Sequence, residues 1–390
     1  MLNRRYLRIK VMQNFFAFIQ CRQSDFHLGL DLIKEEFAPD LNSMEVQDPV
    51  KLEADRKAAS DLFAAGYKEM KLAPAKETTE AQTKAAQDAL QYYDKLVRQD
   101  TQHLRKSMVA EAEKIAERYL EFLLLLTELV SYARNERDKR LSLGRSAKID
   151  ETNWLNNRVV EQLAQNKPLQ VEAIKHNLQW NDEQEFIKQL YKEVLGKDET
   201  FLKYLEKSGT TFEDDKQIVL HIIKKVFFKN ELVSSLMDQR DLYWAENREV
   251  LKSMVQRTVK ALEEENNDQF ELAELSYNWE DDKEFFIDLF NLSIRHEKEY
   301  EEMISQKSKN WDVERLALLD RVILIMALCE MINFSSIPVK VTINEYIELA
   351  KKYSTPKSKF FINGVLDVLS NELQEKGLIK KSGRGLIDNK

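Results

Sequence analysis

Residues 311–373 read WDVERLALLDRVILIMALCEMINFSSIPVKVTINEYIELAKKYSTPKSKFFINGVLDVLSNEL, and this stretch decides the fold of the chain. It predicts three consecutive helices, the first at about residues 312–332. That first helix is apolar on nearly every side, which is typical of the central helix of a bundle. Because Asp320 and Arg321 lie within it, a helix of this length makes a poor membrane span. We expect Asp320 to be a structural charge that a neighbour satisfies.

Start and stop signals bound the second and third helices. Thr342-Ile-Asn-Glu345 fits a capping box, in which the Thr and Glu side chains bond each other's backbone N–H groups. A Thr-Pro pair predicts a third helix that begins near Ser358, and Gly377 can end it. Gly364 lies in the middle of that helix, where a glycine costs ~1 kcal/mol relative to alanine. It is either a tolerated imperfection or a point of close approach by another helix or a ligand.

Three clusters in this stretch are specific in combination: Ile-Asn-Glu at 343–345, Glu-Leu-Ala-Lys-Lys-Tyr at 348–353 and Phe-x-Asn-Gly-Val-Leu at 361–366. Together they resemble the C-terminal signature of the NusB family of bacterial transcription antitermination factors. Residues 310–332 resemble the central helix of that family, and the resemblance covers roughly residues 285–373. It implies an all-α bundle that binds RNA.

Residues 3–22 predict an amphipathic helix that begins with an arginine cluster. Arg4, Arg5 and Arg8 crowd its first turns, where the helix dipole disfavours cations. They are either a solvated, frayed end or a cluster that binds phosphates. The stretch also resembles the first helix of NusB proteins, which contributes to RNA binding, and this resemblance favours the second interpretation.

Roughly 200 residues separate this helix from the NusB-like part, whereas ordinary members of the family are single small domains. Long charged helices are predicted in the insertion at about 77–106 and 109–140, after a short helix at 25–40. The organisation that we expect is an N-terminal helix of the NusB-like fold (1–24), a helical insertion (25–149), a helical module (150–244), a NusB-like domain (245–380) and a basic tail (381–390).

An internal repeat at an offset of 99 residues supports the separate module. Trp180-NDEQEFIKQLYKEVL aligns without gaps with Trp279-EDDKEFFIDLFNLSI. Two copies are too few for a solenoid, so the choice lies between a partial duplication and a chance match of two amphipathic helices. The first copy lacks the Ile-Asn-Glu and Phe-x-Asn-Gly clusters, and we assign no RNA site to it.

Composition agrees with an all-α protein. Nine glycines, six prolines and 32% charged residues suit long helices and leave little material for β-turns. Cys21 and Cys329 predict buried free thiols in a reducing cytosol, and no signal peptide or membrane segment is visible. We therefore expect a cytoplasmic protein.

Charge is distributed unevenly along the chain. The net charge is −8, yet residues 1–24 and residues 351–390 each carry +5, which leaves −18 between them. If the two basic ends meet in space, they form one local patch that binds anions.

No arrangement of residues points to catalysis. The sequence contains no glycine-rich phosphate loop, and its five histidines are scattered without metal-ligand spacing. NusB-like domains also occur fused to RNA methyltransferases, but those need a Rossmann-type domain, which nothing here resembles. We expect no enzyme, no cofactor and no metal.

The resemblance implies a transcription antitermination factor that binds single-stranded leader RNA of the boxA type together with the ribosomal protein NusE. Such a complex modifies RNA polymerase, chiefly on ribosomal RNA operons. We expect two groups of residues to bind the RNA: Arg4, Arg5 and Arg8, and Lys357, Ser358 and Lys359. The alternative is a helical protein-interaction scaffold whose degenerate NusB domain binds RNA weakly or not at all.

Overall fold

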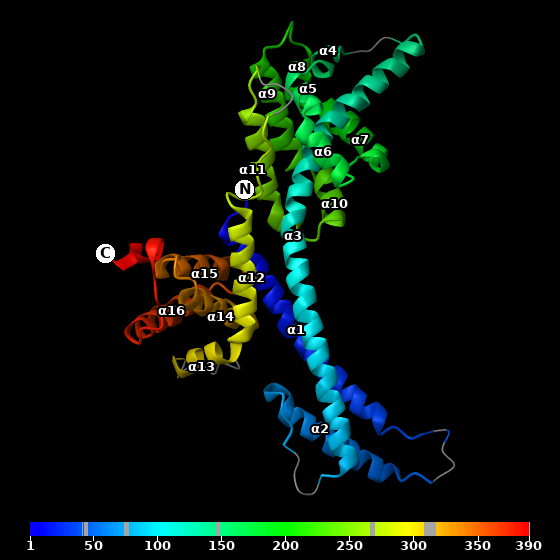
Figure 1. The fold of residues 1–390 in the computed structure, drawn as a ribbon. Coiled ribbons are helices and arrows are strands. Elements are labelled where there is room, and N and C mark those ends of the chain that lie inside the picture. The colour runs from blue at the N-terminus through cyan, green and yellow to red at the C-terminus, as the bar shows by residue number, and fades with distance from the viewer. Residues whose placement is uncertain are drawn as a thin grey trace. The chain divides into compact units, whose positions relative to one another are not determined.

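The structure is a computed structural model that describes residues 1–40, 42, 46–73, 78–145, 149–265, 270–307 and 317–389. These ranges form helices joined by short turns and contain no strand, which confirms the all-α class (Figure 1). The chain divides into two compact units, which we call unit 1 (Met1–Asn3 with Glu111–Trp279) and unit 2 (Arg4–Ala110 with Glu280–Lys390). No helix in the described ranges combines the length and apolar character that crossing a membrane requires.

Unit 2 contains both the N-terminal helix and the C-terminal bundle. Its elements are α1 (Arg4–Glu36), α2 (Pro49–Gly66), η1 (Tyr67–Glu69), the first part of α3 (Glu80–Ser142), α12 (Trp279–Arg295), α13 (Glu297–Lys307), α14 (Leu318–Asn333), α15 (Val339–Tyr353), α16 (Ser358–Glu375) and η7 (Gly383–Asn389).

Helix α14 is the centre of the C-terminal bundle. Every residue from Val322 to Met331 is buried, and the helix contacts α1, α13, α15 and α16. The predicted central helix is thereby confirmed, although its expected beginning at 312–316 lies outside the described residues. The prediction for α16 is confirmed as well: it begins at Ser358, and Gly377 follows its end with a φ of +66°.

The predicted capping box at Thr342 is wrong. Helix α15 begins earlier, at Val339 directly after Pro338. Thr342 therefore lies inside the helix, and its hydroxyl donates to Glu330 rather than capping a terminus. The Thr-x-x-Glu pattern marks two residues that bind partners on other helices.

Helix α1 is one continuous helix of 33 residues where two were predicted. Its first half packs on α14, and its second half packs with α2 and α3 around Ile33, Phe63 and Tyr93. Gly29 permits this packing, because a Cβ there would lie 2.6 Å from the Phe63 ring. The C-terminal bundle and the first part of the insertion thus share one helix without a break.

Helix α3 is also continuous, over 63 residues, where the sequence predicted separate helices at 77–106 and 109–140. Its second part belongs to unit 1. The other elements of unit 1 are η2 (Asn181–Glu183), η3 (Leu190–Val194), η4 (Leu195–Lys197), η5 (Ile222–Phe227), α4 (Thr152–Leu155), α5 (Arg158–Gln165), α6 (Lys167–Lys175), α7 (Gln184–Gln189), α8 (Glu199–Leu205), α9 (Phe212–His221), α10 (Glu231–Arg240) and α11 (Trp244–Ala261).

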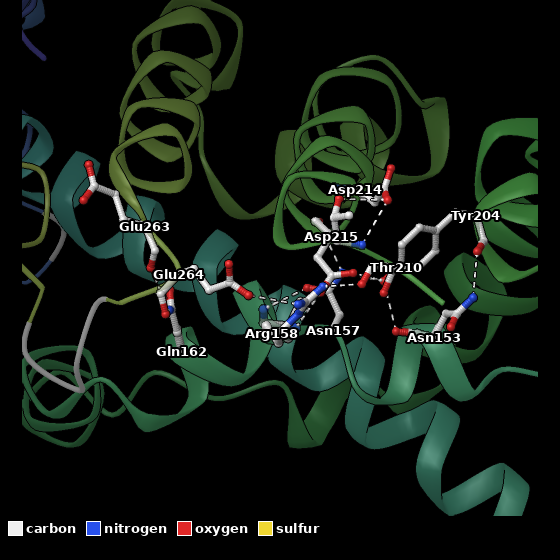
Figure 2. A network of polar contacts seen from close by, with 12 residues as sticks. Asn153, Asn157, Arg158, Gln162, Tyr204, Thr210, Asp214, Asp215, Glu263 and Glu264 are labelled. Atoms are coloured by element: carbon white, nitrogen blue, oxygen red, sulfur yellow. Dashed lines mark hydrogen bonds and ion pairs between the residues drawn. The ribbon is translucent and has the colours of Figure 1, made fainter. Parts of the chain in front are cut away.

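A buried polar network holds three helices of unit 1 together (Figure 2). Asp215 of α9 is fully buried and accepts hydrogen bonds from Arg158 Nε of α5 at 2.7 Å and from the Tyr204 hydroxyl of α8 at 2.9 Å. Arg158 also donates from its backbone N–H to the same carboxylate and from Nη2 to the Thr210 carbonyl. Side chains and backbone of the neighbouring helices donate hydrogen bonds to the buried Asp215 carboxylate. We therefore interpret the network as structural.

Asp25 is a second buried carboxylate, on α1 in unit 2. It is 5% exposed, and its Oδ2 has no hydrogen-bond partner in the part of the chain that the structure describes. Burial, and next the nearby charge of Asp100, raise the pKa of Asp25 to about 6. An acid with a raised pKa stabilises the fold in its protonated form, below its unfolded pKa, and loses that contribution as the pH rises through its folded pKa.

Replacing Asp25→Asn is therefore expected to stabilise unit 2 by about 1–2 kcal/mol at pH 7.5, and to have little effect at pH 4. Hydrogen exchange of the α1 amides in both proteins, corrected for the intrinsic rate at each pH, measures the difference for unit 2. Asp100→Asn, which removes the second charge, should give a smaller change of the same sign. Equal pH dependence of wild type and Asp25→Asn would contradict the prediction.

Candidate nucleic-acid interface

Arg8 lies at the buried end of the first basic group. It is 3% exposed, and its Nε and Nη2 each donate to a carboxylate oxygen of Glu330 at 2.7 Å. Glu330 belongs to α14 and is fully buried. Burial alone would lower the pKa of Arg8, but the Glu330 carboxylate raises it above its ordinary value. The pair is a buried bridge between α1 and α14.

Two hydroxyls of α15 complete the surroundings of Glu330. Thr342 donates to one carboxylate oxygen at 2.8 Å, and the Tyr346 hydroxyl donates to the other at 3.2 Å. Burial, and next the Glu330 charge, raise the pKa of Tyr346, so that it keeps its proton. One carboxylate therefore joins α1, α14 and α15, and this junction fixes the first turns of α1 on the bundle.

Arg4 and Arg5 are the accessible members of the same group, with side chains that are 39% and 49% exposed. Arg4 contacts Asp282 at 3.1 Å, and its guanidinium lies 4.7 Å from the centroid of the Phe285 ring. Arg5 donates two hydrogen bonds to Glu345, both 2.8 Å long. Each of these arginines is thus paired with a carboxylate and also has an outer side in contact with solvent.

The second basic group surrounds the start of α16. Ser358 is buried and donates to Asp320 of α14 at 2.7 Å, and Ser354 donates to the same carboxylate. The sequence predicted that a neighbour would bond the Asp320 carboxylate, and these two hydroxyls do so. Lys357 is exposed, and Lys359 is half-buried with its Nζ 4.8 Å from the centroid of the Phe360 ring. Only the two lysines of this group present cations at the surface.

The two groups occupy one unit but not one cluster. Glu330 is bonded to Arg8 of the first group, and Asp320 is bonded to Ser358 of the second group. These two acids are ten positions apart on α14. A rise of 1.5 Å per residue separates the two anchors by about 15 Å along the helix. The basic ends therefore lie on the same bundle, at different levels of its central helix.

The sequence did not reveal the acids that pair with the arginines. For Glu330 a signal existed, because a single acid in the apolar run ALCEMI needs a buried partner. Asp282 and Glu345 lie among other charged residues and carry no such signal. Gly364 is exposed, and a Cβ there would meet nothing within 4 Å. Among the described residues no helix approaches it closely, which favours the tolerated imperfection.

The described residues contain no cluster of His, Cys, Asp and Glu that could hold a metal ion. Cys329 is buried and Cys21 is half-buried, and both are free. Burial raises the pKa of the Cys329 thiol to about 12, so it stays protonated.

Comparison with known proteins agrees with the signature at the C-terminus. A model of the NusB family matches residues 245–371. The transcription antitermination protein NusB of Chloroherpeton thalassium is 42% identical over 106 residues, which are 27% of this chain and 50% of that protein. NusB of Salinibacter ruber is 41% identical over 105 residues, which are 66% of its length, and NusB of Dictyoglomus turgidum is 40% identical over 104 residues, which are 70% of its length.

These matches define a transcription antitermination domain of the NusB type in the C-terminal part of the chain. The chain belongs to the NusB family. It spans between half and 70% of the length of these relatives, and the matched residues are 27% of its own length. A solved structure of NusB from T. maritima, 24% identical, covers 40% of this chain and 91% of its own with a TM-score of 0.23.

Proposed function

We propose that this protein is a transcription antitermination factor without enzymatic activity. In this proposal it acts in the cytoplasm, binds single-stranded boxA-type leader RNA together with the ribosomal protein NusE, and takes part in the antitermination complex of RNA polymerase. The observation that supports the proposal most is the junction at Glu330, which holds the arginine cluster of α1 on the bundle that carries the NusB signature.

The six proposed RNA-binding residues divide into two kinds. Arg4, Arg5, Lys357 and Lys359 have side chains that reach solvent, and guanidinium groups suit bidentate contact with phosphates. Arg8 and Ser358 are buried and bonded to acids of α14. In our proposal these two are positioning residues, which hold the exposed cations of α1 and α16 in place.

The acids beside the exposed arginines compete with RNA. Glu345 occupies two of the five N–H donors of Arg5, on Nε and Nη2. A phosphate bound at the remaining donors still meets the negative charge of Glu345, which weakens the interaction relative to a free arginine. The same pairing keeps a second candidate function open, the protein-interaction scaffold in which RNA binding has weakened or been lost.

Fluorescence anisotropy of a labelled boxA-type RNA, with and without NusE, tests the proposal. The Arg4→Ala/Arg5→Ala variant should bind roughly ten- to a hundredfold more weakly at low salt, because two charged contacts are lost. Its log–log salt slope should become shallower by about 1.4, since each phosphate of a single strand contributes about 0.7. Glu345→Gln should bind several-fold more tightly, because Arg5 loses its competitor.

Arg56→Ala, in α2, is the matched control because the Arg56 side chain is 37% exposed, close to that of Arg4, and it should leave binding unchanged. Contacts with four to six phosphates predict a wild-type slope of roughly −3 to −4. If neither RNA alone nor RNA with NusE binds the wild type, the RNA role is wrong and the scaffold function is favoured.

We also propose that residues 150–244 are a degenerate duplication of the C-terminal module, within the five-part organisation expected from the sequence. The order of helices supports this. Between Trp180 and residue 244 come α7 with its turns, α8, α9 with η5, and α10; after Trp279 come α12, α13, α14 and α15, with α16 as a further helix. The indole N–H groups of both tryptophans reach α3, at the Glu121 carbonyl and the Glu113 carboxylate.

A further inference from the structure

Phe360 has an aromatic side chain on the solvent-exposed surface of the C-terminal bundle. Its ring is 72% exposed, although the next two residues of α16 are half-buried and buried. The backbone N–H of Phe360 donates to the Lys357 carbonyl at 3.1 Å, so the ring belongs to the first turn of the helix. The helix therefore directs this ring to solvent while its neighbours build the core.

Three features of the surroundings suit a flat, negatively charged ligand. Lys359 places its Nζ 4.8 Å from the ring centroid, and the exposed Lys357 lies at the start of the same turn. Residues four apart share one face of a helix, so Gly364 follows Phe360 on that face. Gly364 is exposed and has nothing within 4 Å of its Cβ position, so this residue adds no side chain beside the ring.

We propose that Phe360 is a stacking platform for one unpaired base of the bound RNA, with Lys357 and Lys359 contacting the adjacent phosphates. Unstacked bases in single-stranded RNA are commonly held on aromatic rings, and every base offers a flat face for this contact. Cations beside the ring supply the charge complementarity that a polyanion needs. The inference rests on the proposed RNA-binding function and adds a residue that contacts bases rather than phosphates.

Substitutions at Phe360 test the platform with the same labelled single-stranded RNA. Phe360→Ala should weaken binding roughly 5- to 150-fold while leaving the salt slope unchanged, because no cation is removed. Phe360→Leu keeps apolar bulk but lacks an aromatic face, and should behave like Phe360→Ala. Phe360→Trp should retain binding, and its additional emission relative to the wild type should be quenched when RNA is added.

Val368→Ala is the matched control, because Val368 is 53% exposed on the same face of α16 and has no ring. It should bind RNA as the wild type does. If the wild type binds RNA and Phe360→Ala binds it equally well, the platform is wrong and the proposed function stands. If Phe360→Ala loses NusE but not RNA, the ring belongs to a protein contact, which also overturns the inference. If the wild type binds no RNA, both proposals fail together.

Discussion

Glu330→Ala is expected to destabilise the C-terminal bundle by about 3–5 kcal/mol, because a buried guanidinium loses the carboxylate bonded to it and keeps only Glu345, 3.8 Å from Nη1, as a charged partner. Arg8 is 3% exposed and donates hydrogen bonds from Nε and Nη2 to this one carboxylate. Thr342 and Tyr346 lose their acceptor at the same time. The substitution therefore removes the group to which three helices are bonded.

Hydrogen exchange of the α1 and α14 amides is the appropriate measurement, since a chain with two units does not unfold as one two-state system. Exchange should accelerate in both helices, while amides of α9 in unit 1 stay at their wild-type rates. An Arg8→Met/Glu330→Met variant should recover much of the loss, because it removes both charges together and fills a similar volume. If Glu330→Ala exchanges like the wild type, Arg8 is not a positioning residue.

Asp215→Ala is expected to cost unit 1 about 1.5–3 kcal/mol, the range for hydrogen bonds to a charged group. Asp215 is fully buried and accepts hydrogen bonds from Arg158 and Tyr204, which come from two other helices. Burial, and next the hydrogen bond to Asp215, raise the pKa of Tyr204, so its hydroxyl remains a donor. Removing the acceptor takes away the bond that joins Arg158 and Tyr204, and leaves Tyr204 with the Asn153 carbonyl and Arg158 with Thr210 and Glu264 as acceptors.

Urea unfolding followed by tryptophan fluorescence reports on this unit, because four of the five tryptophans lie in unit 1. Asp214→Ala is the matched control at the neighbouring position. Asp214 caps the start of α9 with Thr211, and hydrogen bonds from Lys207 and then from Thr211 lower its pKa to about 2. Losing this exposed cap should cost only about 1 kcal/mol, and equal effects of the two substitutions would contradict a structural network at Asp215.

Local patterns predicted the helices whose signals are local. α14 is apolar on every side and α16 has a clear start at Ser358, and both occur where they were expected. The continuity of α1 was missed because Ser24-Asp25 resembles the start of a new helix. In the structure Asp25 is buried within α1. The stretch between the two helices predicted within α3 contains no glycine or proline, so nothing in the sequence required a break there.

The candidate site shows the limit of local patterns more sharply. Position and charge indicated which arginines cluster at the start of α1, but not that Arg8 is buried and Arg5 accessible. That distinction depends on Glu330 and Glu345, which lie 322 and 340 residues away along the chain. The Thr-x-x-Glu pattern resembles a helix cap, but its Thr342 and Glu345 side chains form hydrogen bonds with Glu330 and Arg5 instead. No window of the sequence contains both partners.

The distance between Arg8 and Glu330 also matters during synthesis on the ribosome. At roughly 5–20 residues per second, α14 emerges on the order of 15–65 s after the beginning of α1. During this interval the apolar face of α1, with Leu7, Phe15 and Phe18, has no bundle to cover it. The second half of α1 stays uncovered for a shorter time, because the core that it forms with α2 and α3 is complete once Tyr93 has been synthesised. The insertion thus gives the nascent helix a partner long before the rest of the bundle exists.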